Sequence, residues 1–142
     1  MSKKFKDQEK RIELVFNNKF KDLSRGLETL EHYKSFLEEK LIFPISLTGV
    51  EDFDWEEYYL LGPGDKREYE RLKKTQASYT DVFIMNKISP NIDEHYGLFA
   101  NVTRPADKKK FELPLADLKA IDKKSDDYLL LHDYSVWFIN YQ

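Results

Sequence analysis

The sequence predicts an α+β protein in which a small antiparallel SH3-like β-barrel follows an N-terminal helical arm. Two observations predict this architecture. Apolar residues recur at intervals of three and four through the first forty residues, as they do along one face of a helix. From residue 42 onward the pattern changes to short alternating runs separated by turn residues, which is typical of strands. We therefore expect a helical arm over residues 1–41 and a barrel domain over residues 42–142.

The arm is expected to hold two helices, over residues 6–17 and 26–41. Asn17-Asn18 interrupts the apolar periodicity between them. Pro44 then ends the helical region, because a proline disfavours helical geometry at the residue before it, here Phe43.

The barrel is expected to consist of short strands joined by hairpins, which makes the sheet antiparallel. Ser89-Pro90-Asn91 is expected to end the second strand, and Arg104–Lys109 to form a hairpin turn. The expected strands cover residues 43–50, 80–88, 97–103 and the run that carries Phe111, Leu113 and Leu115.

Two further helices are expected in this half of the chain. The long connection over residues 51–79 contains a capping-box pattern, Asp65 followed by Glu68, which predicts a short inserted helix over residues 65–74. Asp133 is the expected cap of a short C-terminal helix that carries Trp137 and Phe138.

The composition excludes several classes of protein. The chain has 142 residues and no cysteine, so disulfides, thiolate zinc sites and cysteine nucleophiles are absent. With 26 acidic and 23 basic residues it has no overall attraction to nucleic acid, and acidic residues are interleaved with the basic ones of the first helix. No apolar run approaches the roughly 20 residues that span a membrane. The N-terminus has no apolar signal region, so we expect a cytoplasmic protein.

The sequence carries no recognisable catalytic machinery. His32, His95 and His132 lack the spacing of metal-binding histidine motifs, and no Gly-x-Ser-x-Gly nucleophile turn is present. We therefore expect a binding protein and not an enzyme.

Four segments of the chain carry a resemblance to a known family. They are Leu41-Ile42-Phe43-Pro44, Tyr96-Gly97-Leu98-Phe99, Phe111-Glu112-Leu113-Pro114-Leu115-Ala116-Asp117-Leu118 and Leu131-His132-Asp133-Tyr134-Ser135-Val136-Trp137-Phe138. In order and spacing they resemble the CcbP-type calcium-binding proteins, small barrels with metal sites that are not EF-hands. Together they cover most of residues 33–138, and the region 51–79 departs from the shortest members. The resemblance implies calcium binding.

Acidic residues in separate loops are the candidate calcium ligands. Calcium takes six to eight oxygen ligands and tolerates irregular geometry, and no EF-hand loop is present. In an SH3-like barrel the connection at residues 51–57 and the loop at 93–94 rise from the same end as the turn near Asp117. The predicted ligands are Glu51, Asp52, Asp54, Asp93, Glu94 and Asp117. For each carboxylate, simple solvation in a surface loop is the alternative interpretation.

A protein-interaction module without metal is the alternative function. Trp55, Tyr58 and Tyr59 lie in the connection that would border the aromatic groove of an SH3-like barrel. Packing of these rings against the inserted helix is the competing interpretation. The sequence leaves the partner and the oligomeric state undetermined.

Overall fold

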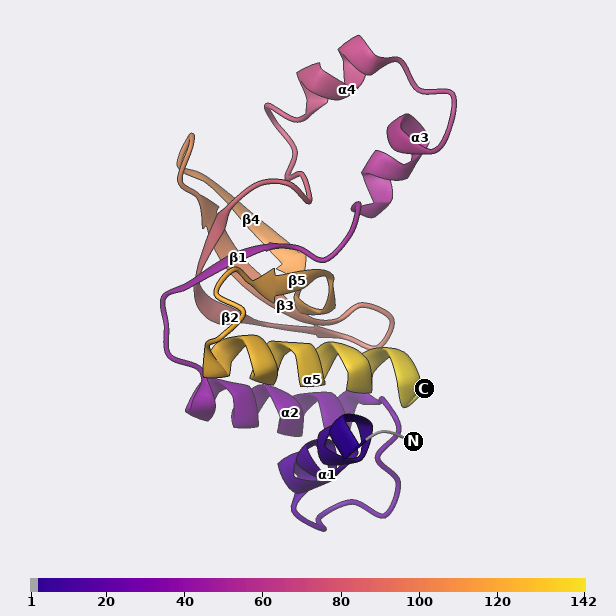
Figure 1. Cartoon of the computed structure of the whole chain (residues 1–142), viewed down its shortest axis with the longest axis vertical. Coiled ribbons are helices and arrows are strands. Elements are labelled where there is room, and N and C mark those ends of the chain that lie inside the picture. The colour runs from indigo at the N-terminus through magenta and orange to yellow at the C-terminus, as the bar shows by residue number, and fades with distance from the viewer. Residues whose placement is uncertain (1–2) are drawn as a thin grey trace.

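The structure, a computed structural model, describes the backbone of residues 3–142 and the side chains from residue 6 onward. It has three layers (Figure 1). Helices α1 (Lys3–Phe16), α2 (Leu27–Lys40) and α5 (Asp126–Asn140) lie on one side of an antiparallel sheet. The segment between β1 (Ile45–Gly49) and β2 (Phe83–Asp93) rises away from the sheet on the opposite side. The predicted α+β class is confirmed.

Five strands form one sheet in the order β4-β3-β2-β1-β5, and every neighbouring pair is antiparallel. Leu47 of β1 pairs with Phe83 of β2 on one side and with Ala120 of β5 on the other. In the part of the chain that the structure describes, β4 and β5 are the edges and do not pair with each other, so the sheet is open. The strands are β1 (Ile45–Gly49), β2 (Phe83–Asp93), β3 (Gly97–Arg104), β4 (Lys109–Pro114) and β5 (Leu118–Ala120).

The second strand does not end at Ser89-Pro90-Asn91 as predicted but continues to Asp93. The pairing of β2 with β3 shifts between Ile88 and Ile92, and Pro90 lies inside this irregularity. A proline lacks the N–H that a regular ladder needs, so it is tolerated where the ladder is already interrupted.

Gly97 closes the turn after β2 and explains how tightly this turn packs on α5. Its φ is +78°. A Cβ at this position would lie 2.5 Å from the Tyr134 hydroxyl and from a ring carbon of Phe138. Only glycine has both this backbone conformation and this small size.

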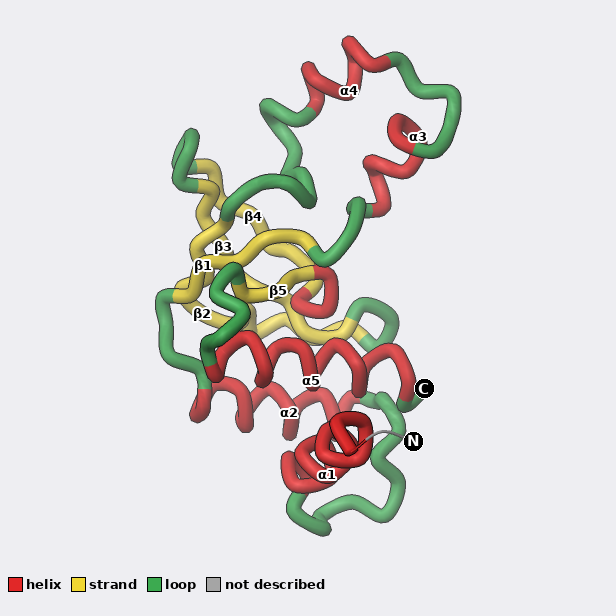
Figure 2. Tube along the Cα trace, in the orientation of Figure 1, coloured by secondary structure: helices red, strands yellow, loops and turns green. Residues whose placement is uncertain are grey.

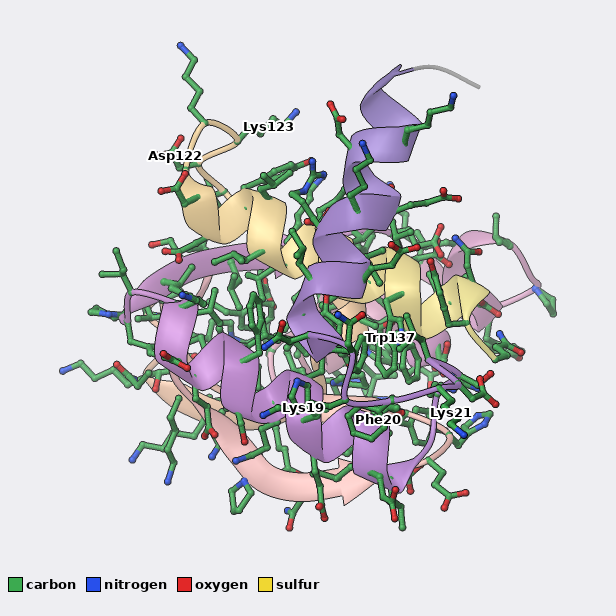
Figure 3. The ribbon with its side chains drawn as sticks, turned by 90° about the horizontal axis from the view of Figure 1, so that it is seen from below. Lys19, Phe20, Lys21, Asp122, Lys123 and Trp137 are labelled. Carbon is green, nitrogen blue, oxygen red and sulfur yellow. The ribbon has the colours of Figure 1, made fainter. Side chains whose placement is uncertain are left out.

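One hydrophobic core joins the helical layer to the sheet, and it includes Ile12 of α1 as well as Leu47 of β1. Aromatic rings fill its centre. Trp137 is fully buried, with its ring 5.6 Å from that of Phe16 and 5.0 Å from that of Tyr33. Figure 3 shows Trp137 among the densely packed side chains of the helical layer. The N-terminal helices therefore pack on the rest of the protein.

The C-terminal helix is longer than predicted. It begins at Asp126, and the Ser125 hydroxyl caps it by accepting the N–H of Tyr128 at 3.1 Å. The prediction that Asp133 caps the helix is wrong, because Asp133 lies in the interior of α5 and accepts two hydrogen bonds from Arg11, at 2.8 and 3.1 Å. An aspartate before an apolar run looks like a cap, and here its partner is on α1. None of the helices in the described residues is long and apolar enough to cross a membrane.

The segment between β1 and β2, residues 50–82, is called the excursion below. It contains a 3-10 turn (Asp54–Glu56), α3 (Glu57–Leu60) and α4 (Lys66–Leu72), as Figure 2 shows. Asp65 caps α4 by accepting the N–H of Arg67 at 3.0 Å, which confirms the predicted inserted helix and its cap. A second 3-10 turn, Leu115–Asp117, connects β4 to β5.

Candidate functional site

A buried carboxylate closes the base of the excursion. Glu56 has no solvent exposure, and its Oε2 accepts hydrogen bonds from the hydroxyls of Tyr69 at 2.7 Å and Ser78 at 3.1 Å. Its Oε1 accepts the N–H of Tyr79 at 2.8 Å. These bonds join the start of the excursion to its end, so Glu56 fixes where the neighbouring residues Asp54 and Trp55 stand.

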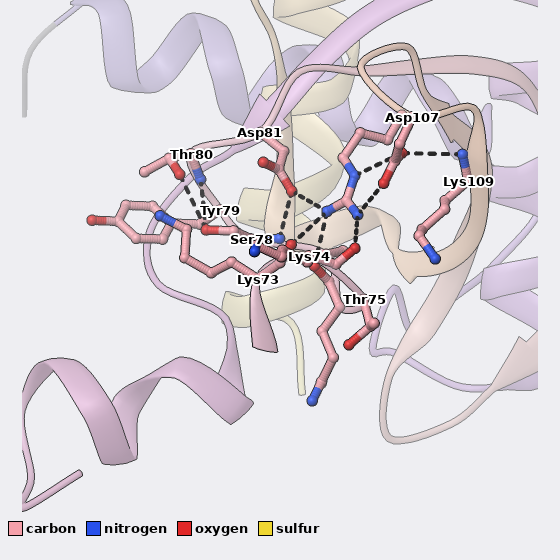
Figure 4. A network of polar contacts seen from close by, with 12 residues as sticks. Lys73, Lys74, Thr75, Ser78, Tyr79, Thr80, Asp81, Asp107 and Lys109 are labelled. Carbon is pink, nitrogen blue, oxygen red and sulfur yellow. Dashed lines mark hydrogen bonds and ion pairs between the residues drawn. The ribbon is translucent and has the colours of Figure 1, made fainter. Parts of the chain in front are cut away.

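A buried arginine attaches the excursion to the sheet (Figure 4). Arg104, at the end of β3, is 4% exposed. Its guanidinium donates to Asp81 at 2.8 Å and to Asp107 at 2.7 and 3.1 Å. It also donates to three backbone carbonyls that follow α4, those of Lys73, Lys74 and Gln76. The excursion is therefore held at both of its ends.

Three of the predicted ligands come together where the excursion leaves the sheet. Asp117 ends the 3-10 turn after β4, and its carbonyl accepts the N–H of Val50 at 2.9 Å. Partial burial, together with repulsion from Asp54 and Glu51, raises the pKa of Asp117 to about 6. Within residues 6–142, none of the ion pairs includes any of these three carboxylates. In this part of the chain, no ion pair balances their negative charge.

Two of the other predicted ligands, Asp93 and Glu94, stand apart from this cluster. Asp93 lies in the turn between β2 and β3, where its Oδ1 accepts the N–H groups of His95 at 2.7 Å and Tyr96 at 2.8 Å. These bonds lower the pKa of Asp93. Glu94 is exposed in the same turn, and Asp52 is half-buried after β1. In Figure 1 the turn lies beside the C-terminal half of α5, whereas the excursion rises on the other side of the sheet.

The described part of the chain holds no group of three or more His, Asp or Glu side chains already arranged to hold a metal ion. Glu51 and Asp54 are exposed, so their side chains are free to turn toward Asp117. An ion at this cluster would therefore be bound by side chains that move onto it.

The aromatic residues of the excursion pack mainly on one another. The ring of Trp55 lies 5.6 Å from that of Tyr69 on α4, and Tyr59 stacks on Tyr69 at 5.6 Å. For Trp55 and Tyr59 this confirms packing against the inserted helix. Tyr58 is 56% exposed.

Sequence reasoning missed Glu56 and Arg104. Glu56 looks like any other member of an acidic run, and Arg104 was assigned to a hairpin turn. The one available signal for Glu56 was its position at the edge of an aromatic run, between Trp55 and Tyr58. Nothing local to Arg104 indicated its partners, because four of them lie 23 to 31 residues away in the sequence.

Replacing Asp117 by asparagine is expected to stabilise the metal-free protein at neutral pH. The folded-state pKa of about 6 lies above the unfolded value of about 3.9. Stability therefore falls as the pH rises through this window, and the full penalty is present above pH 6. Because Asp117 keeps solvent contact, water screens the repulsion, and we expect a gain of about 1 kcal/mol, or roughly 3 °C.

Thermal unfolding in a chelator-containing buffer measures this effect. The variant should melt above the wild type at pH 7.5 and nearly together with it at about pH 3, below both the folded and the unfolded pKa, where the carboxyl group is protonated in both states. An unchanged or lower melting temperature at pH 7.5 would contradict the repulsion.

Comparison with known proteins identifies the fold. No protein-family model matches the sequence, and a search of curated proteins returns no significant match. Among solved structures, the chain is similar to the crystal structure of Anabaena CcbP, with a TM-score of 0.60 and 17% sequence identity. The similarity covers 93% of this chain and 89% of that one. The resemblance inferred from the sequence is thus confirmed as a shared fold.

Proposed function

We propose that this protein binds calcium, as a buffer or a sensor, at the cluster formed by Glu51, Asp54 and Asp117. The observation that carries the proposal is that Asp54 and Asp117 line one cleft, with Glu51 near enough to repel Asp117. Within residues 6–142, none of the ion pairs includes any of these three carboxylates. Like charges held close together favour the binding of a cation. The shared fold supports calcium as that cation, since CcbP is a calcium-binding protein.

The chemistry of the cluster favours calcium over magnesium. Three carboxylates offer up to six oxygens, and water or backbone carbonyls complete an irregular shell of the kind that calcium accepts. Magnesium requires nearly ideal octahedral geometry, which ligands from separate, exposed loops do not impose. Exposed carboxylates give an affinity in the ~10⁻⁴–10⁻³ M range. Asp93 and Glu94 are less suitable ligands, because the Asp93 carboxylate already accepts two backbone N–H groups of its own turn.

We further propose that the protein is non-catalytic and that its strands have an SH3-like arrangement. The first residues of the long β2, 83–85, pair with β1, whereas its pairing with β3 runs from Ile84 through two irregularities to Asp93. A 3-10 turn precedes β5. A strand that bends in this way can serve both halves of a small barrel. The excursion takes the place of the long loop between the first two strands.

Calorimetric titration of the metal-stripped full chain with calcium tests the proposal. At a hundredfold excess over Kd, calcium should stabilise the fold by about 2.7 kcal/mol, or roughly 10 °C, and magnesium should do less. Asp117→Asn should lose the response. Asp93→Asn should keep it, and Glu70→Gln, an exposed position on α4, serves as the matched control.

Each outcome decides a separate point. No heat and no thermal shift at calcium concentrations up to about 100 mM, a hundredfold excess over a Kd of ~10⁻³ M, would refute calcium binding. If Asp93→Asn also loses the response, the turn between β2 and β3 contributes to the site. A response that survives in Asp117→Asn would place the ion elsewhere.

A further inference from the structure

A cleft of about 390 Å³ lies between the excursion and the edge strand β4. Its size falls within the roughly 300–1,000 Å³ of small-molecule sites. Side chains from the excursion line one side, and residues from β4 and the turn after it line the other. Its walls include Phe53, Trp55, Ala77, Leu113, Asp54 and Asp117.

The cleft is built from fixed groups. The indole N–H of Trp55 donates to the carbonyl of Ala77 at 2.7 Å, which joins two of the lining residues directly. The ring of Phe53 stacks on that of Phe83 in the core at 6.5 Å. The excursion is in turn held by Glu56 and Arg104. A preformed apolar cleft of this kind binds ligands without first ordering its walls.

The charge of the cleft selects its ligand. Asp54 and Asp117 both line it, and Glu51 adds to the negative field at Asp117. No cationic side chain belongs to the lining, and none of the ion pairs in residues 6–142 includes these carboxylates. An anion would be repelled here, and a neutral molecule would leave the carboxylates without a partner. A cation on an apolar body matches both the walls and the charge.

We propose that this cleft binds an organic cation, a molecule or side chain whose apolar body ends in an ammonium or guanidinium group. The apolar body lies against Trp55 and Leu113, and the cationic nitrogen lies between Asp54 and Asp117. The site goes beyond calcium binding but shares two carboxylates with the calcium site proposed above. Calcium and the organic cation therefore compete, and by linkage each weakens the binding of the other equally.

Titration of the metal-stripped full chain with phenethylamine tests the proposal, with 2-phenylethanol as the neutral counterpart of the same shape. The amine should bind at least tenfold more tightly than the alcohol. Asp54→Asn should weaken the amine about tenfold and leave the alcohol unchanged, and Glu70→Gln should change neither. Trp137 is fully buried, so a ligand-dependent change in tryptophan fluorescence reports Trp55. Equal affinities for the amine and the alcohol would overturn the proposal. So would the absence of binding by both phenethylamine and the arginine peptide described below.

A second probe separates the two sources of such a cation. An acetylated and amidated Leu-Arg-Pro peptide is compared with its citrulline counterpart. Tighter binding of the arginine peptide than of phenethylamine identifies a protein side chain as the source, and the reverse identifies a free amine. Millimolar calcium should weaken whichever probe binds. Failure of the amine and peptide with an intact calcium response overturns this inference alone, whereas binding of a probe without any calcium response overturns the calcium site alone.

Discussion

Replacing Arg104 by alanine is expected to destabilise the protein by on the order of 3–5 kcal/mol, because the change removes one partner of a buried ion-pair network. The guanidinium of Arg104 is nearly fully buried and has two carboxylate partners, those of Asp81 and Asp107. In the variant the Asp81 carboxylate loses its counter-ion, and three carbonyls after α4 lose a donor. Chemical unfolding in urea at pH 7.5 measures the loss.

Two variants and one change of pH control for this result. Arg104→Lys keeps the charge but cannot reach all the acceptors of a planar guanidinium, so it should fall between wild type and alanine. Lys109→Ala, an exposed position on the same hairpin, should have little effect.

Hydrogen bonds from Arg104 lower the pKa of Asp107 to about 2. This carboxyl therefore contributes stability above its unfolded pKa, and the contribution is lost as the pH falls from about 4 toward 2. The difference in the free energy of unfolding between wild type and Arg104→Ala should therefore narrow in that pH window. If Arg104→Ala lowers the free energy of unfolding by less than about 1 kcal/mol at pH 7.5, Arg104 does not have the assigned role.

The sequence predicts the helices and most strands well because their apolar residues repeat with a clear period. Ile12, Leu30 and Leu37 lie on buried helical faces, as the spacing of three and four requires. Leu98, Ala100 and Val102 alternate into the core from β3. The three-residue strand β5 was missed, since it is too short to establish a period. The start of α5 was misplaced because Asp133 and Ser125 are both good caps locally, and only the contact with Arg11 distinguishes them.

The candidate site could be predicted only in part. Asp54 and Asp117 were predicted from their residue type and their expected loops, and the structure brings them to one cleft. The cleft itself was beyond prediction, because its walls come from the excursion and from β4. The groups that fix the excursion, Glu56 and Arg104, are polar residues whose burial depends on distant partners. Such burial leaves no mark on the local sequence pattern.

Replacing Glu56 by alanine is the second change with a large expected effect, a loss on the order of 3–5 kcal/mol. The Tyr69 hydroxyl would lose its partner in a buried site, and the N–H of Tyr79 would lose its acceptor; each such loss costs about 1–3 kcal/mol. Burial and the bond to Glu56 raise the pKa of Tyr69 to about 12, so the phenol keeps its proton at neutral pH and donates to Glu56. Glu56→Gln keeps a carbonyl acceptor of the same shape and should recover part of the stability. Glu57→Ala, at the exposed neighbouring position, should be close to neutral.

The readout has to separate global unfolding from opening of the excursion alone. Urea unfolding reports the first, and limited proteolysis within residues 57–77 reports the second, since a locally opened segment is cleaved while the core stays folded. Because Glu56 fixes the position of Asp54 and Trp55, Glu56→Ala should also weaken calcium and phenethylamine binding together. A variant with wild-type stability, wild-type proteolysis and unchanged binding of both would show that the excursion keeps its place without Glu56. In that case the shared dependence of the two ligands on Asp54 would need another structural basis.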